Sequence, residues 1–372
     1  MIKIFFILIF SFPLFFSSIN SNPLKLPYEN RSLIVLAAPS IWDVNYADDF
    51  VSIVEFQIKL VKILNEYETA ILIADRHTMP LLDGRTKMLR EHLPSTLLLE
   101  GNIYDINLRD FAPMGCLKQV KFIYRNADWA PIASKQVDDS MNRFLIKNRI
   151  KLQRREPEIF LSGRDVVDNG RNRALIANTA LITNMEKLPE WSLTLKLQNA
   201  FNKVVIVPSP TSFTGRKNLR LDDVLSFADD GLLIISGLDP ITKSRTISEI
   251  YKREKKDVAV LELPIGDEDK FAKEPYLRDE GNCGLYTTML GTEKTLFVPV
   301  FGNNPANWKH GYSTKTDKMV LRLIETNTRK RVIPVNIPRE ICRRGISLRS
   351  LTWILRGSAA NQIRGLAKGK EN

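Results

Sequence analysis

The sequence predicts an α/β protein, because short apolar runs of strand length alternate along it with stretches of helical periodicity. Its 372 residues are enough for a large core, and 44% hydrophobic with 26% charged residues is typical of a globular protein rather than a disordered one. No linker rich in Pro and Ser and no exact repeat divides the chain. We therefore predict one large α/β domain.

The first residues predict a targeting signal. Lys3 precedes an almost unbroken apolar run over residues 4–16, and Ser17, Ser18 and Ser21 offer small residues for cleavage. The run is too short for a comfortable membrane span. We predict a signal peptide over residues 1–21 that is cleaved during secretion, with an uncleaved membrane anchor as the alternative.

The domain is expected over residues 22–356, with helices over 50–64 and, more weakly, over 188–201, where apolar side chains recur at helical spacing. Residues 357–372 are basic and lack apolar periodicity past Leu366, which predicts a tail that frays. Strands are expected where β-branched or aliphatic runs are bounded by Gly, Pro, Asn or Asp. These runs are residues 33–38, 70–74, 120–124, 174–182, 204–207, 232–235, 258–263, 296–301 and 332–335.

Three cysteines are too few for a fold built on disulfides, and in an exported chain they allow at most one bridge. Whether any of Cys116, Cys283 and Cys342 pair is left open. Cys283 and Cys342 are interpreted as free thiols, packed or exposed.

The formal charge of +12 has two interpretations. A solvated face that keeps the protein soluble is favoured, and an anionic partner such as a nucleic acid, a glycan or an acidic membrane surface is the other. Aromatic residues do not alternate with the basic ones as base stacking requires, which weakens the nucleic-acid version. The basic clusters are residues 147–155, 252–256, 329–331, 343–344 and 356–370.

Common cofactor and metal motifs are absent from the sequence, which has no GxGxxG after a strand, no GxxxxGK(S/T), no HExxH and no CxxC. The three histidines, His77, His92 and His310, lie in no recognisable catalytic or metal-binding motif. Each is interpreted as structural or exposed. We expect neither a metal nor a cofactor.

Four segments in a fixed order carry the functional signal. Residues 108–113 read LRDFAP, 162–170 read SGRDVVDNG, 219–230 read LRLDDVLSFADD, and LYTT at 285–288 is followed by GISLRSLTW at 345–353. They are similar to the RDxGP, GGNxxxDG, GHxDxxxxFxDD and SYxN…GG(S/N)xHCxT motifs of guanidine-modifying deiminases. Over about residues 30–356 the chain resembles the family of agmatine deiminases and Porphyromonas-type (bacterial-type) peptidylarginine deiminases, and the SGRDVVDNG hairpin favours the peptidylarginine branch.

The resemblance implies a pentein fold, a five-bladed α/β propeller with a pocket on its pseudo-fivefold axis. It also implies a cofactor-free hydrolysis in which two carboxylates hold the guanidinium, a Cys thiolate attacks its carbon, and a His acts as acid and base. Asp110 and Asp222 match the carboxylates; without the resemblance they would be interpreted as a turn cap and a partner of a surface lysine. Arg220 stands at the position of that His, and Ser350 at that of the Cys.

Further departures change the charge of the site. Arg349 replaces the His that precedes the nucleophile, and Arg164 replaces a hairpin Gly. A serine hydroxyl is a poor nucleophile without a base, and an arginine cannot be that base because it stays protonated. Two guanidinium charges ~4 Å apart repel by roughly 4 kcal/mol at an effective dielectric of 20, so an arginine near the carboxylates would oppose a substrate guanidinium.

We expect Arg220 or Arg349 to turn onto Asp110 or Asp222 and occupy the guanidinium site, since buried carboxylates need a partner. The sequence thus predicts a secreted deiminase-like protein without hydrolase activity that acts as a binding protein, for a guanidinium or arginine-containing ligand if the pocket is open. One alternative is a working C–N hydrolase on arginine-like or agmatine-like substrates with an unrecognised nucleophile. The other is a protein that binds an anionic surface or polymer through its basic clusters. The oligomeric state is left open.

Overall fold

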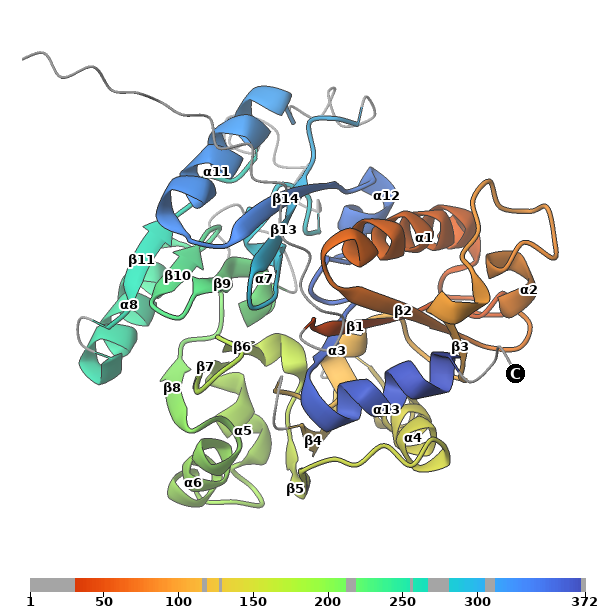
Figure 1. The fold of residues 1–372 in the computed structure, drawn as a ribbon. Helices are drawn as coiled ribbons and strands as arrows, with labels where there is room; N and C mark the ends of the chain where they lie inside the picture. The colour runs from red at the N-terminus through yellow and green to blue at the C-terminus, as the bar shows by residue number, and fades with distance from the viewer. Residues whose placement is uncertain are drawn as a thin grey trace, which may run out of the picture.

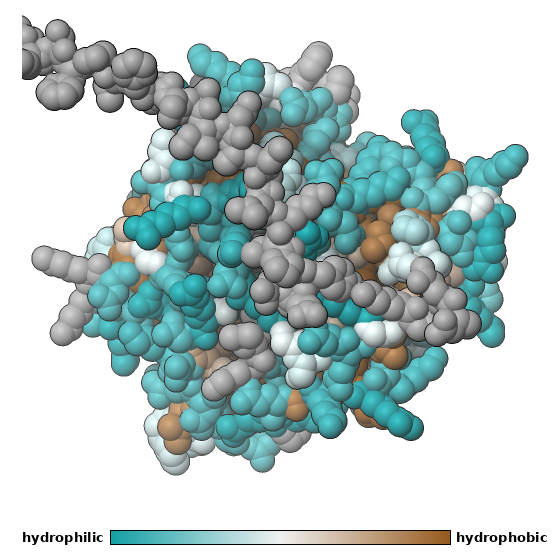
Figure 2. Space-filling model, in the orientation of Figure 1, coloured by the Kyte–Doolittle hydropathy of each residue, from teal (hydrophilic) through white to brown (hydrophobic). Residues whose placement is uncertain are grey.

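The computed structural model describes residues 31–115, 119–126, 129–211, 219–254, 257–266, 281–304 and 312–368. Five small sheets surround a common centre, and helices cover the outside (Figure 1). Polar side chains cover most of the face drawn in Figure 2, and hydrophobic ones form small separate patches on it. The α/β pentein architecture expected from the resemblance is confirmed.

The sheets share one strand pattern. A central strand pairs antiparallel with one edge strand and parallel with the other, as in β6–β7–β8, β9–β10–β11 and β12–β13–β14. In the sheet of β4 and β5 a bridge between Met114 and Val120 takes the place of the antiparallel edge. The strands are β1 (Leu33–Ala37), β2 (Thr69–Ala74), β3 (Leu98–Glu100), β4 (Val120–Ile123), β5 (Arg154–Phe160), β6 (Val166–Asp168), β7 (Arg173–Ala177), β8 (Lys203–Val207), β9 (Leu225–Asp229), β10 (Leu232–Ile235), β11 (Ala259–Glu262), β12 (Leu290–Gly291), β13 (Thr295–Val300), β14 (Arg331–Asn336) and β15 (Trp353–Leu355).

In each sheet one long helix lies between the central strand and its parallel neighbour and packs on the outer side, and the short α5 precedes it in the sheet of β7 (Figure 1). Helix α1 illustrates the cause, because Val54, Ile58 and Val61 recur at helical spacing and are fully buried. The five connecting helices are α1 (Phe50–Tyr67), α4 (Pro131–Lys147), α6 (Glu190–Phe201), α8 (Pro240–Glu254) and α11 (Thr314–Asn327). Shorter helices are α2 (Met79–Leu82), α5 (Thr179–Asn184) and α12 (Arg339–Arg343), and α13 (Gly357–Lys368) ends the described chain.

The two ends of the domain meet in one sheet. Strand β15 pairs antiparallel with β1, with Leu355 opposite Leu33 and Trp353 opposite Val35, so the last strand closes the ring beside the first. Helix α13 then packs over this sheet and buries Ala360 and Ile363 completely. The expectation of a fraying tail is therefore wrong for residues 357–368. Apolar side chains do recur there at helical spacing.

The expected central strands all form, with shifted ends. The run predicted over 174–182 stops at Ala177, because the chain turns at Asn178 into α5. The strands β3, β6, β12 and β15 were not predicted, since segments of two or three residues carry too little pattern, and the longer β5 and β9 were missed as well. The signal predicted over 1–21 lies outside the described residues. Within the described ranges, no helix is long and apolar enough to cross a bilayer.

Candidate functional site at the centre of the propeller

Five short turns meet at the centre and carry the residues singled out by the motifs. Each precedes the antiparallel edge strand of one sheet or, in the sheet of β4, the bridge at Met114. Neighbouring turns are hydrogen-bonded: the amide of Arg109 donates to the carbonyl of Ser350 at 3.0 Å, and the Thr287 hydroxyl donates to the carbonyl of Asp223. The turns are α3 (Leu108–Phe111), η4 (Gly163–Asp165), α7 (Leu221–Val224), η6 (Tyr286–Thr288) and residues 347–351.

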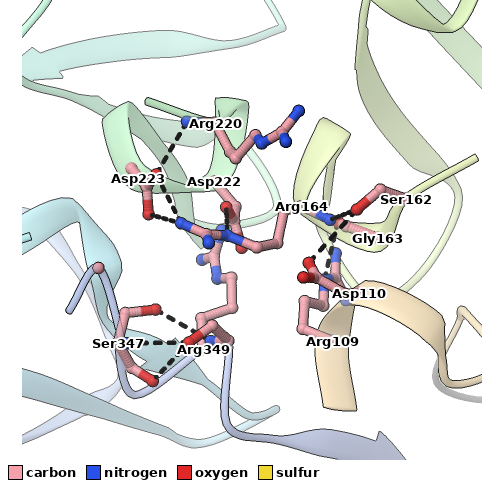
Figure 3. A network of polar contacts seen from close by, with 12 residues as sticks. Arg109, Asp110, Ser162, Gly163, Arg164, Arg220, Asp222, Asp223, Ser347 and Arg349 are labelled. Atoms are coloured by element: carbon pink, nitrogen blue, oxygen red, sulfur yellow. Dashed lines mark hydrogen bonds and ion pairs between the residues drawn. The ribbon is translucent and has the colours of Figure 1, made fainter. Parts of the chain in front are cut away.

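Arg164 holds two adjacent carboxylates of α7. Its Nη2 lies 2.7 Å from both carboxylate oxygens of Asp223, and its Nε lies 3.4 Å from Oδ1 of Asp222 (Figure 3). The side chain of Arg164 is 14% exposed, and those of Asp222 and Asp223 are 0% and 1% exposed. Burial opposes the charge of Arg164, but Asp223, Asp222 and Asp110 raise its pKa well above the ordinary value. The protein's own guanidinium therefore sits on one of the two carboxylates matched to substrate binding.

Close packing between α3 and η4 fixes the position of Arg164. A Cβ at Gly163 would lie 1.9 Å from the carbonyl oxygen of Arg109, so only glycine fits there. The Arg109 guanidinium donates from Nε to the carbonyl of Gly163 at 3.1 Å and from Nη2 to Asp168 at 2.9 Å. These contacts present Arg164 to the neighbouring turn α7.

The other matched carboxylate, Asp110, is not paired in the same way. It accepts a hydrogen bond from the Ser162 hydroxyl at 3.3 Å. Burial raises the pKa of Asp110 to about 7, although the charges of Arg164 and Arg220 lower it. Burial likewise raises the pKa of Asp222 to about 6, and its Oδ2 has no hydrogen-bond partner among the described residues. The two matched carboxyls are thus buried acids of weakened charge.

Ser350 is fully buried and its hydroxyl is committed to its own turn. Its Oγ accepts from the amide of Ser347 at 2.9 Å and donates to the carbonyl of Ser347 at 3.2 Å. In return, the Ser347 hydroxyl accepts from the amide of Ser350 at 2.9 Å. A side chain held in this reciprocal pair stabilises the turn and makes no described contact with a base.

Arg349 is hydrogen-bonded to strand β9 and lies close enough to Asp222 for their charges to interact. Its Nη1 donates to the carbonyl of Leu225 at 3.2 Å, and its Nη2 donates to the hydroxyl of Ser226. The residue is only 9% exposed, and burial lowers the pKa of its guanidinium to about 10 although Asp222 opposes that shift. Arg349 therefore fills space between a central turn and a strand.

Arg220 is the N-cap residue of α7, and its guanidinium points away from Asp222 in Figure 3. Its Nη2 lies 3.4 Å from Oδ1 of Asn126. An arginine does contact a matched carboxylate, as expected. The prediction that this arginine is Arg220 or Arg349 is wrong, because Arg164 makes the contact with Asp222.

The residue that the motifs missed is Asp223, the main partner of Arg164. The only available signal was the pair of consecutive aspartates, Asp222 and Asp223. Such a pair does not indicate where either side chain points.

Within the part of the chain that the structure describes, the cysteines and histidines lie outside this centre. Cys283 and Cys342 form a disulfide with Cα atoms 4.8 Å apart, so their interpretation as free thiols is wrong. Cys116 and His310 lie outside the described residues. His92 faces the carbonyl of Leu81 at 3.2 Å through Nδ1, and His77 contacts Arg76. Among the described residues, no group of three or more His, Cys, Asp or Glu side chains is arranged to hold a metal ion.

The five sheets around a common centre define the class of protein, one with the pentein fold. The model of the Porphyromonas-type peptidyl-arginine deiminase family matches residues 27–354, and the chain belongs to that family. No curated protein matches the sequence.

Solved structures of related enzymes share the fold. C. jejuni agmatine deiminase is 17% identical, with a TM-score of 0.65 over 90% of this chain and 96% of that one. The agmatine deiminase of Enterococcus faecalis is 14% identical, with a TM-score of 0.62 over 89% and 95% of the two chains. At such identities the likeness establishes the fold, and the chemistry has to be argued from the residues of this chain.

Proposed function

We propose that this protein is a non-hydrolytic member of its family that acts by binding. The observation that carries the proposal is the guanidinium of Arg164 on Asp222 and Asp223, at the place where the motifs predict a substrate guanidinium. A second guanidinium brought there would meet charge repulsion of roughly 4 kcal/mol at ~4 Å and an effective dielectric of 20. The buried Ser350 hydroxyl and the arginine at position 220 provide neither a thiolate nor a general base.

The test is ammonia release from agmatine and from an arginine-containing peptide. No release above the buffer blank is expected for the wild-type protein at pH 6 to 9. Release that the Ser350→Ala variant abolishes would overturn the proposal and establish the alternative, a working C–N hydrolase. In that alternative neither Cys283 nor Cys342 supplies the thiolate, because they are joined to each other.

We also propose that the protein is secreted. The apolar run over residues 4–16 and the disulfide between Cys283 and Cys342 support export to an oxidising compartment. N-terminal sequencing of the protein recovered from the medium should begin near residue 22. Recovery of the uncleaved chain in the membrane fraction would favour an anchor instead.

An anionic partner is a second candidate for the binding role. The end of α4, the turn after it and the start of β5 expose Lys147, Arg149, Lys151 and Arg155 within nine residues of sequence. Such a cluster attracts a polyanion with an affinity that falls steeply with salt. A variant in which these four basic residues are all replaced by glutamine should elute from heparin at clearly lower salt than the wild type. Equal elution of the two proteins would exclude this turn as the contact surface.

A further inference from the structure

A group of exposed apolar side chains lies on two adjacent helices of the sheet of β7. Trp191 and Leu195 are 72% and 52% exposed and lie four residues apart, so they share one side of α6. Ile182 in α5 and Met185 directly after it are 62% and 68% exposed, and α5 packs against α6. Figure 2 shows hydrophobic side chains at the lower left, where Figure 1 places α6. We call these four residues the α5–α6 apolar group.

The α5–α6 apolar group does not belong to the core of its sheet. Leu193 and Leu197 lie on the other side of α6, are buried, and pack into the core under the helix. Their burial accounts for the docking of α6 onto the sheet, and the outer side of the helix could be polar without loss to the core. Single exposed apolar residues are common on protein surfaces, but a group of four on neighbouring helices is typical of a surface that binds something.

The basic cluster of residues 147–155 lies beside this group. Strand β5 carries the end of the cluster and is bonded to a helix on either side. Lys196 of α6 pairs with Glu158 of β5 at 3.0 Å, and the Arg155 guanidinium donates to the side-chain oxygen of Asn142 in α4 at 3.0 Å. The elements α6, β5 and α4 accordingly follow one another along the lower edge of Figure 1. The apolar group and the basic cluster therefore belong to neighbouring parts of one side of the molecule.

The basic cluster also carries an apolar side chain. Ile146, the last residue but one of α4, is 68% exposed and directly precedes the exposed Lys147. On α5 and α6 the exposed Glu186 and Glu190 offset the lysines nearby, so the positive charge of this side comes from residues 147–155. One side of the molecule thus combines exposed apolar side chains with positive charge.

We propose that this side of the molecule docks onto a lipid bilayer that contains anionic lipids. The α5–α6 apolar group enters the headgroup region, and residues 147–155 lie over the lipid phosphates. Exposed apolar side chains beside Lys and Arg are typical of proteins that bind a bilayer surface without crossing it, and tryptophan is favoured at the headgroup level. Each basic residue near an anionic surface strengthens binding by about fivefold. The inference rests on the anionic-partner role proposed above and specifies that partner.

Two other occupants agree less well with these features. A polyanion such as a nucleic acid would contact the basic residues and leave the exposed apolar side chains without a role. A stable dimer buries about 800 Å² on each partner, which is more than four partly exposed side chains provide. The formal charge of +12 also makes two copies of this chain repel each other. An anionic bilayer uses the apolar and the basic residues together.

The experiment is cosedimentation with lipid vesicles of the chain from residue 22 onward, which lacks the apolar run over 4–16. Vesicles of phosphatidylcholine alone are compared with vesicles that contain about one third phosphatidylglycerol, and the mixed vesicles should bind the protein at least about tenfold more tightly. Trp191→Ala combined with Leu195→Ala, the apolar variant, should weaken this binding by about tenfold. The glutamine variant of the heparin test should weaken it by more than about tenfold.

Two further variants are matched controls. Trp42→Ala removes a tryptophan that is 73% exposed in another part of the molecule and should leave vesicle binding unchanged. A second glutamine variant removes the same charge from α11 and the turn after it, which lie across the ring in Figure 1, and should weaken binding by less than about twofold. Its replaced residues, all exposed, are Lys315, Lys318, Arg322 and Arg329.

Heparin separates the lipid contact from a simple polyanion contact. The apolar variant should elute from heparin with the wild type, because heparin has no apolar layer. Three outcomes would overturn the inference: equal binding to the two kinds of vesicle, unchanged vesicle binding in the apolar variant, and a dimer in sedimentation velocity that the apolar variant abolishes. The second outcome, together with weaker heparin binding of the glutamine variant, would leave the anionic-partner role standing. Ammonia release in the same samples would refute only the inactive central site, so the proposals fail separately.

Discussion

Two groups of carboxylates lie close together in this protein in very different surroundings. At the centre, Asp222 and Asp223 are 1% exposed and hold Arg164 from the same chain. A neighbouring cavity of about 830 Å³ between the loops 40–46 and 102–107 is lined by Asp43, which is half-buried, and by Asp105, which is 7% exposed. Carboxylates taken fully out of water need a permanent partner, since isolated buried charges are strongly destabilising. Asp43 keeps some contact with water, whereas Asp105 is stabilised by hydrogen bonds from the amide and the side chain of Asn107.

The largest effect on stability is expected from removing Arg164, the permanent partner of Asp222 and Asp223. Arg164→Met keeps most of the side-chain volume and removes the cation, which leaves Asp222 and Asp223 buried without it. We expect a loss of about 3–5 kcal/mol in the free energy of unfolding at pH 8, measured by urea denaturation. The loss should shrink towards pH 5, because Asp222, whose pKa burial raises to about 6, can then take up a proton.

An exposed arginine is the control for this change. Arg171 pairs with Asp230, and their side chains are 56% and 47% exposed. Arg171→Met should cost no more than about 1 kcal/mol. If the two variants lost equal stability, the contrast between the buried and the open carboxylates would have no energetic basis.

The next effect concerns the disulfide that joins the two regions. Residues shortly after Cys342 line the open cavity through Arg344 and the central ring through Ser347. Replacing Cys283 and Cys342 together by serine should cost about 2–4 kcal/mol, the usual value for a loop of this length, 59 residues. A thermal melt of the variant, with the wild type under reducing conditions as the comparison, measures the effect. Identical melting of oxidised and reduced wild-type protein would contradict it.

The central site shows which of its features could be predicted from the sequence and which could not. The ordered motifs predicted the fold and placed Asp110, Asp222, Arg220 and Ser350 on central turns, because motif order follows the order of the sheets. They could not predict which arginine reaches Asp222. That depends on which turns are neighbours in the ring and on the close approach at Gly163, and neither is encoded locally.

Two other features of the structure differ from the sequence predictions, each for its own reason. The pairing of Cys283 with Cys342 is a tertiary contact across 59 residues and has no local signature. The C-terminal helix did have one, since Ala359, Ile363 and Ala367 recur at helical spacing and are buried. The prediction of a fraying tail gave too much weight to the basic residues of this segment and too little to its helical periodicity.

A smaller effect is expected from the pH dependence of Asp110. Burial raises the pKa of its carboxyl to about 7 in the folded protein, whereas an unfolded aspartate has a pKa near 4. The folded state therefore binds the proton more tightly, and the contribution of this group to stability falls as the pH rises from about 4 to about 7. Asp110→Asn should be about 1–3 kcal/mol more stable than the wild type at pH 8 and indistinguishable from it at pH 4. Asp139→Asn, at a side chain that is 40% exposed and pairs with Lys135, is the control, and a constant difference across this range would refute the assignment.

The smallest expected effect concerns Ser350, whose replacement by cysteine restores the residue type of the family's nucleophile. In Ser350→Cys the thiol would replace a fully buried hydroxyl that is bonded to Ser347, so we expect a stability change of about 1 kcal/mol or less. The new thiol should react with a disulfide reagent only when the protein unfolds, since reactivity requires access and a thiolate, and no described base faces this position. Ser52→Cys on the exposed face of α1 is the control and should react at once. Rapid labelling at position 350 in the folded protein would mean that the central turn opens readily, and the argument that this position is closed to chemistry would then fail.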